Sequence, residues 1–204
     1  MLYETCVDLS PDLWEELLTL EPAAVIARSG AVFREGAYSL PYLDRQLVIH
    51  PASRRIETPE TPGSDPGHRA GLTALCYLLY VDIHALGPGA GPLELAGGVA
   101  FFRGVHAVPR AALEARFGRD AQGFLAAGRR LGGALMAAGD AALSLPVFPG
   151  LAVEVILWQA DDEFPAQVSF MVPSNIHRFW QLDAVFALLE LVRDELLRAA
   201  APQS

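Results

Sequence analysis

Three consecutive acids, Asp161, Asp162 and Glu163, lie in the stretch LWQADDEFPAQ, between two apolar segments and shortly before a proline. Neighbouring carboxylates can bind a hard divalent cation, which takes about six oxygen ligands. The same side chains also accept hydrogen bonds from backbone N–H groups where a chain turns tightly. Three contiguous acids rarely aim all their oxygens at one point. We therefore predict a structural turn with no metal and no cofactor, and we keep metal binding as the alternative.

Two residues just before the acids could extend a site. Glu154 and Trp158 occur at even spacing in LAVEVILW, so they share one face of a predicted strand. Apolar neighbours that shield a glutamate from water raise its pKa, as in many enzymes that use a glutamate as a general acid. A shielded glutamate on an edge strand has the same pattern, and we favour that interpretation.

A third group of candidates is basic. His68 and Arg69 open a long apolar segment, where free helix N–H groups and positive side chains could receive an anion. His106 is a further candidate that could converge on the acids. We favour the interpretation that His68 and Arg69 merely face solvent where the preceding loop ends, because one His-Arg pair is a weak signal. No histidine pair has the spacing typical of a metal site.

Composition excludes several functions. The 204 residues carry 24 acids against 15 bases, a net charge of -9, so we expect neither nucleic acid nor an anionic membrane as a partner. All the bases are arginine. The absence of lysine excludes Schiff-base catalysis and a phosphate loop that ends in Gly-Lys-Ser/Thr.

The two cysteines, Cys6 and Cys76, are too few for a cysteine-rich zinc site or an iron–sulfur cluster. Cys76 lies in an apolar segment, so we predict two unpaired thiols in a reduced, cytoplasmic protein. The first residues are acidic, whereas a signal peptide begins with basic ones, and the apolar runs are too short to span a bilayer.

Hydrophobic periodicity predicts an α+β fold with one domain over residues 1–204. The pattern indicates an N-terminal antiparallel meander and a C-terminal hairpin that pack on a buried central helix and on a C-terminal amphipathic helix. The predicted strands are 31–35, 37–43, 46–51, 54–59, 99–105, 151–158 and 166–172; the main helices are 70–83, 120–138 and 182–197.

Several motifs recur in one order along the chain: SGAVF, YSLPYLDRQLVIHP, TALCYLLYV, ARFGRDAQGFLAAGRRLGG, GDAALSLP and LWQADDEFPAQ. In this order they resemble the prokaryotic domain-of-unknown-function family 3786, whose members carry Trp-x-Gly-Asp-Glu-Glu-Phe-Pro at the acidic stretch. The resemblance extends from about Trp14 to Leu197. It implies kinship and no defined activity.

The chain departs from the family pattern at the acidic stretch. Ala160 replaces the usual glycine, Asp162 stands for a glutamate, and FMVPS at 170–174 lacks the aspartate expected after the second strand. Some members of the family are fused to an iron–sulfur segment and occur in anaerobes. The resemblance therefore implies a setting in redox or one-carbon (corrinoid) metabolism.

Two classes of function stay open, and the sequence does not decide whether the protein is an enzyme. We favour a non-catalytic binding or accessory module with a protein partner or a small-molecule ligand, because no complete catalytic set is visible. The alternative is a metal-dependent enzyme or small-molecule binder that uses the acidic stretch.

Overall fold

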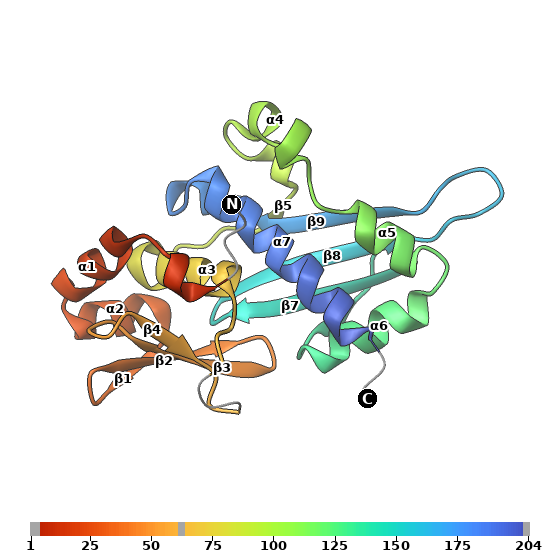
Figure 1. The fold of residues 1–204 in the computed structure, drawn as a ribbon. Helices are drawn as coiled ribbons and strands as arrows, with labels where there is room; N and C mark the ends of the chain where they lie inside the picture. The colour runs from red at the N-terminus through yellow and green to blue at the C-terminus, as the bar shows by residue number, and fades with distance from the viewer. Residues whose placement is uncertain (1–4, 61–63, 202–204) are drawn as a thin grey trace.

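Two antiparallel sheets and seven α-helices make up the fold of the computed structural model, which describes residues 5–60 and 64–201 (Figure 1). The predicted α+β class is confirmed. The helices are α1 Pro11–Thr19, α2 Pro22–Ser29, α3 His68–Tyr80, α4 Gly98–Phe101, α5 Ala111–Phe117, α6 Ala121–Arg130 and α7 Leu182–Ala199.

The first sheet is the predicted meander, with strand order β1-β2-β3-β4. Its alternating side chains place one apolar face in the core, as a half-buried sheet requires. The short turns are possible because Glu35 and Leu43 adopt left-handed backbone angles, with φ of 52° and 51°. The strands are β1 Val32–Arg34, β2 Ala37–Tyr42, β3 Arg45–His50 and β4 Arg55–Glu57.

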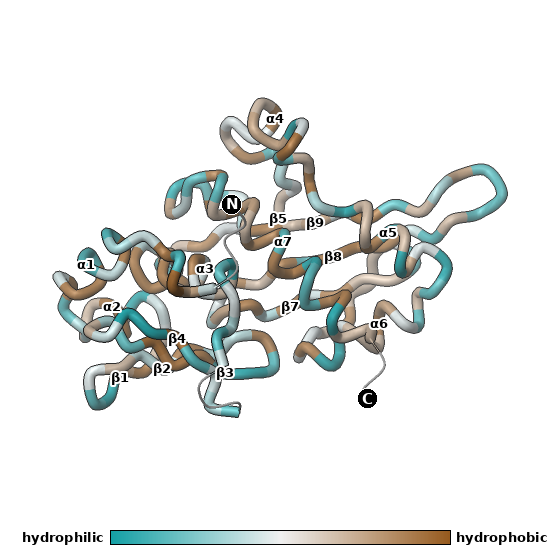
Figure 2. Tube along the Cα trace, viewed as in Figure 1, coloured by the Kyte–Doolittle hydropathy of each residue, from teal (hydrophilic) through white to brown (hydrophobic). Residues whose placement is uncertain are grey.

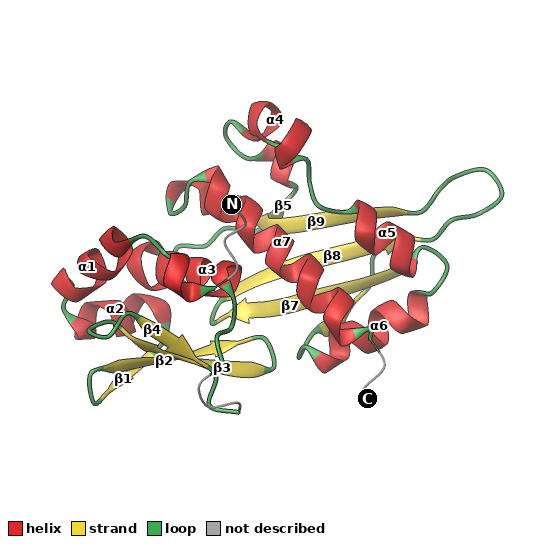
Figure 3. Cartoon of the chain, viewed as in Figure 1, coloured by secondary structure: helices red, strands yellow, loops and turns green. Residues whose placement is uncertain are grey.

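The second sheet has five strands in the order β5-β9-β8-β7-β6 and contains the predicted hairpin as β8 and β9. Helices α5, α6 and α7 lie over one face of it (Figure 3). Side chains on that face of β8 are fully buried, whereas those on the opposite face are partly exposed. The strands are β5 Gly89–Ala90, β6 Ala134–Met136, β7 Ala141–Phe148, β8 Leu151–Trp158 and β9 Gln167–Pro173.

Two predicted elements are wrong. The helix expected over 120–138 ends at Arg130, because the chain reverses at Gly132, with φ of 75°, and then pairs as β6 with β7. The strand expected over 99–105 is instead the short helix α4, followed by a 3-10 turn at Gly104–His106. Glycine at both ends of this segment favours tight turns over an extended strand.

Helix α3 is the buried central helix and is hydrophobic on nearly every face (Figure 2). It ends at Tyr80, earlier than predicted, because the guanidinium of Arg28 binds the carbonyls of Leu78 and Leu79 and so satisfies its last turn. The amphipathic helix expected over 182–197 is confirmed as α7. None of the helices within the described ranges is long and apolar enough to cross a bilayer.

Candidate functional site

The connection between β8 and β9 projects from the edge of the molecule as an extended loop (Figure 1). The ladder of the two strands closes at the pair Trp158 and Gln167, so residues 159–166 lie beyond the sheet. All three acids of the opening stretch are in this loop, which is polar along most of its length (Figure 2).

Asp161 organises the loop. Its Oδ1 accepts hydrogen bonds from the backbone N–H groups of Glu163, at 2.8 Å, and Phe164, at 2.7 Å. The backbone N–H of Asp161 in turn donates to the carbonyl of Phe164 at 3.0 Å. The bonds from Phe164 and Glu163 lower the pKa of Asp161 because they favour its charged form. These are the hydrogen bonds that the turn interpretation expects.

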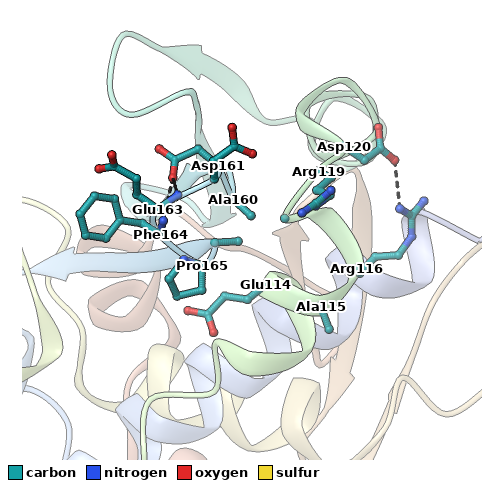
Figure 4. Close-up of a pocket in the computed structure, with 13 residues that line it drawn as sticks. Glu114, Ala115, Arg116, Arg119, Asp120, Ala160, Asp161, Glu163, Phe164 and Pro165 are labelled. Atoms are coloured by element: carbon teal, nitrogen blue, oxygen red, sulfur yellow. Dashed lines mark hydrogen bonds and ion pairs between the residues drawn. The ribbon is translucent and has the colours of Figure 1, made fainter.

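The loop forms one wall of an open groove of about 760 Å³, and the end of α5 together with its connection to α6 forms the other (Figure 4). Five carboxylates and two guanidinium groups line it, so the groove is acidic overall. Arg116 is paired with Asp120 at 3.0 Å, which also lowers the pKa of Asp120, after the larger effect of the backbone N–H of Gly123. The lining residues are 114–116, 118–120 and 160–166.

Long-range hydrogen bonds hold the two walls together. The backbone N–H of Ala160 donates to the carbonyl of Gly118 at 2.8 Å, and Glu114 Oε1 accepts from the backbone N–H of Val168 at 3.0 Å. A Cβ atom added at Gly118 would lie 2.6 Å from the Cβ of Ala166, so this close approach requires glycine. The groove is therefore a fixed part of the fold at its base.

The exposure of the Phe164 side chain was not predicted from the sequence. We expected Phe164 to tuck beneath the turn as an apolar anchor, and that expectation is wrong, because its side chain is 62% exposed. Its ring points away from Arg116 and Asp120 (Figure 4). The loop projects beyond the sheet, so no core lies beneath it. Trp158, at the base of the loop, is 41% exposed, whereas Trp14 and Trp180 are buried.

The acids are not arranged as a metal centre. Across residues 5–60 and 64–201, no group of three or more His, Cys, Asp or Glu side chains is placed to hold a metal ion. One oxygen of Asp161 is already used by two backbone donors. Asp162 and Glu163 are exposed to solvent at the loop. Chemically, the groove offers carboxylates to a cationic surface.

The other candidate residues do not line this groove. Arg69 is ion-paired with Glu190, at 2.9 Å, and Asp194, at 3.3 Å, so its guanidinium binds α7 and not an anion. His68, the first residue of α3, precedes it.

Glu154 and His106 lie on two further elements. Glu154 is on the outer face of β8, between Ser144 and Met171. His106 stacks on Phe101, with ring centroids 4.7 Å apart, and meets the edge of Phe186 at 5.4 Å.

Sequence reasoning missed the second wall of the groove. This wall consists of Glu114 and Arg116 from α5 and of Arg119 and Asp120 from the α5–α6 connection, all between 40 and 50 positions before the acids they face. Their only signal was the charged run EARFGRD, which reads as a solvated helix end. The long-range hydrogen bonds from Ala160 to Gly118 and from Val168 to Glu114 show that it belongs to the site.

Comparison with known proteins gives a family and no activity. No curated protein and no solved structure matches the chain. The family model described as a domain of unknown function (DUF3786) matches residues 21–194, most of the chain, including both sheets and the acidic loop. The protein therefore belongs to the DUF3786 family.

Proposed function

We propose that the protein is a non-catalytic binding module that docks a partner protein through the projecting β8–β9 loop. The observation that carries the proposal is the 62% exposure of Phe164 at a loop whose backbone is fixed by Asp161. An exposed aromatic ring on an ordered loop gains more by burial against a partner than by facing water.

The residues around Phe164 fit this role. Trp158 lies at the base of the same loop, 41% exposed, and tryptophan is among the residues that most often dominate binding energy at interfaces. Asp162 and Glu163 directly precede Phe164 in the loop and expose their carboxylates to solvent. The complementary partner surface is basic and contains an apolar pocket, and the acids would steer its approach.

The proposed docking surface extends from Trp158 onto the outer face of the second sheet. Cross-strand rows on this face join Ile156 to Ser169 and Ala142, and Glu154 to Met171 and Ser144. Glu154 is the charged residue among these six, and the other five are apolar or carry a small hydroxyl group. A weakly polar sheet face next to two exposed rings is typical of the core of a docking surface.

We further propose that the partner belongs to redox or one-carbon (corrinoid) metabolism and that the protein acts in the cytoplasm. The resemblance of the acidic stretch to a family with members fused to iron–sulfur segments supports the first proposal. Two free, buried cysteines support the second.

The test is a comparison of proteins retained by immobilised wild type and by two variants, Phe164→Ser and Trp158→Ser. A docking partner is retained by the wild type and lost by both variants. The purified partner should then bind the wild type more weakly as salt increases, and Asp162→Asn with Glu163→Gln should reduce this salt dependence. Binding should also change the tryptophan fluorescence of the protein. This change reports on Trp158, because Trp14 and Trp180 are buried.

Val32→Ser is the matched control, because Val32 is 47% exposed on β1, in the other sheet. The proposal predicts that this variant retains the partner. Identical sets of retained proteins for the wild type and both loop variants would contradict it. A partner whose binding requires added Mg²⁺ or Ca²⁺, and is lost in Asp162→Asn, would support the metal-dependent alternative instead.

A further inference from the structure

A second hollow lies between α1, α3 and the start of α7, on elements that the loop does not touch. It is an open cleft of about 480 Å³, within the size range of small-molecule sites. Its walls are mainly apolar and aromatic, and they include Leu13, Leu72, Phe179 and Trp180. The first three of these side chains are only partly buried, so the cleft presents apolar surface to solvent.

The aromatic floor of the cleft is fixed in place. The indole N–H of Trp180 donates to the carbonyl of Cys76 at 3.1 Å, and Trp180 is 3% exposed. Cys76 and Tyr80 lie one turn apart on α3 and line the same cleft. Because the one polar atom of the indole is satisfied by α3, the ring is held as a rigid apolar surface for a ligand.

Two carboxylates lie at the rim of the cleft. Asp183 lines the cleft in the first turn of α7 and is exposed. The hydroxyl of Tyr80, which also lines it, donates to Glu16 at 2.6 Å, so a second carboxylate lies at the α1 side. Among the residues that the structure describes, no arginine or histidine lines the cleft. An apolar hollow with carboxylates at its edge favours a ligand with an apolar body and a positive end.

We propose that this cleft binds a small aromatic molecule with a protonated amine, its ring against Trp180 and Phe179 and its ammonium group at Asp183. The ammonium group donates charge-assisted hydrogen bonds to the carboxylate, which fixes the direction of the ligand. The site is independent of the loop proposed to dock a protein partner.

Binding in the cleft is non-covalent. Cys76 is the nearest nucleophile, but burial, and to a lesser extent the charge of Glu16, raise the pKa of its thiol to about 12. The thiolate is the reactive form of cysteine, so this thiol is inert at neutral pH. Cys76 therefore contributes one more weakly polar surface to the wall.

Three probes of one shape and different charge test the proposal: phenethylamine, phenethyl alcohol and hydrocinnamate. The readout is the indole N–H resonance of Trp180 in nitrogen-labelled protein, one of three indole signals. We expect the amine to shift this resonance with an affinity about threefold to fivefold higher than that of the alcohol, since an ion pair with an exposed carboxylate contributes up to about that factor. We expect no shift with the carboxylate.

Two variants locate the site. Asp183→Asn should weaken binding of the amine about threefold to fivefold and leave binding of the alcohol unchanged, because only the charge is removed. Ala184→Leu should abolish binding of both, because it fills the cleft from a position in α7. Asp162→Asn, an equivalent change in the β8–β9 loop, is the control and should leave all three affinities unchanged.

Any one of three results would overturn the proposal. No shift of the Trp180 resonance by the amine up to its solubility limit would exclude the site. Equal affinities for the three probes, or an unchanged affinity for the amine in Asp183→Asn, would show that the rim carboxylate does not select a cation. None of these results bears on the loop, because that proposal is tested with Phe164 and Trp158.

Discussion

Glu195 on α7 lies 2.7 Å from the guanidinium of Arg45 on β3, so the C-terminal helix is tied to the N-terminal meander by a nearly buried carboxylate. The hydroxyl of Tyr42 donates to the same oxygen at 2.9 Å, and Arg198 binds the other oxygen. Burial of Glu195 raises its pKa, but the hydrogen bonds and charges of Arg198 and Arg45 outweigh this effect, and the pKa is lowered overall.

This arrangement predicts a specific sensitivity to acid. Because the pKa of Glu195 is lower in the folded than in the unfolded protein, its ion pairs stabilise the fold above the unfolded value of about 4.3. That stability is lost as the pH falls through the folded pKa. We expect Glu195→Gln to lower the free energy of unfolding at neutral pH by about 2 kcal/mol, less than for a fully buried pair because Arg198 is half exposed.

Thermal unfolding from neutral pH to about pH 3 measures the effect. The curves of the wild type and Glu195→Gln should converge as the pH falls, because the wild type loses a contribution that the variant lacks. Glu163→Gln, in the exposed loop, is the control and should run parallel to the wild type. Parallel curves for Glu195→Gln would show that the carboxylate is not stabilised by its partners.

The turn of the β8–β9 loop gives a second prediction. Asp161→Asn should lower the melting temperature, because the amide oxygen accepts the N–H groups of Glu163 and Phe164 less strongly than the carboxylate does. Since folding lowers the pKa of Asp161, this contribution is present at neutral pH and lost in acid. Asp162→Asn is the matched control and should leave the melting temperature unchanged.

Metal ions separate the two interpretations of the acids. If the acids only shape the turn, added Mg²⁺, Ca²⁺ or chelator should leave the melting temperature of the wild type unchanged. A metal ion that bound only the folded state would raise it. A fall of several degrees with chelator that is absent in Asp161→Asn would identify the acids as metal ligands.

The elements that sequence predicted best are those with a clear period. Alternation predicted the strands of the meander, and a continuous apolar stretch predicted the buried helix α3. Strand β7 was missed because AALSLPVF is buried on most of its length and contains Pro146, so it shows neither alternation nor a helical stripe. Helix α6 was predicted too long because the small residues after Arg130 are compatible with a helix. These residues form a strand because they pair with β7.

At the site, local chemistry was predictable and tertiary placement was not. The hydrogen bonds of Asp161 follow from side-chain and backbone geometry within a few residues. The exposure of Phe164 depends on how far the loop extends beyond the sheet, which no local pattern records. The wall contributed by Arg116 and Asp120 depends on packing of a segment distant in sequence.

Gly118 gives a fourth prediction, on the join between the two walls. An added Cβ would lie 2.4 Å from the carbonyl oxygen of Glu114 and 2.6 Å from the Cβ of Ala166, and neither atom is the end of a flexible side chain. We expect Gly118→Ala to lower the free energy of unfolding by about 1–3 kcal/mol, as for overpacked cores. Denaturant unfolding measures this loss. Gly89→Ala is the control, since its Cβ would meet only ordinary contacts from about 3.5 Å.

Phe164 and Phe170 give the fifth prediction, because two phenylalanines close in sequence have opposite environments. Phe164 is 62% exposed in the loop, whereas Phe170 is 1% exposed on the inner face of β9. Phe164→Ser should therefore change the free energy of unfolding by no more than about 0.5 kcal/mol, as surface substitutions usually do. Phe170→Ala should lower it by about 3–5 kcal/mol through lost burial and a cavity.

Chemical denaturation of both variants at one pH measures the difference, with an unchanged denaturant slope as the sign that the folded state is intact. A stability loss in Phe164→Ser close to that of Phe170→Ala would show that the ring packs within the fold, and it would remove the main support for a docking loop. A stable Phe164→Ser variant has a further use: any loss of partner binding in it reports the interface alone, because the free energy of folding is unchanged.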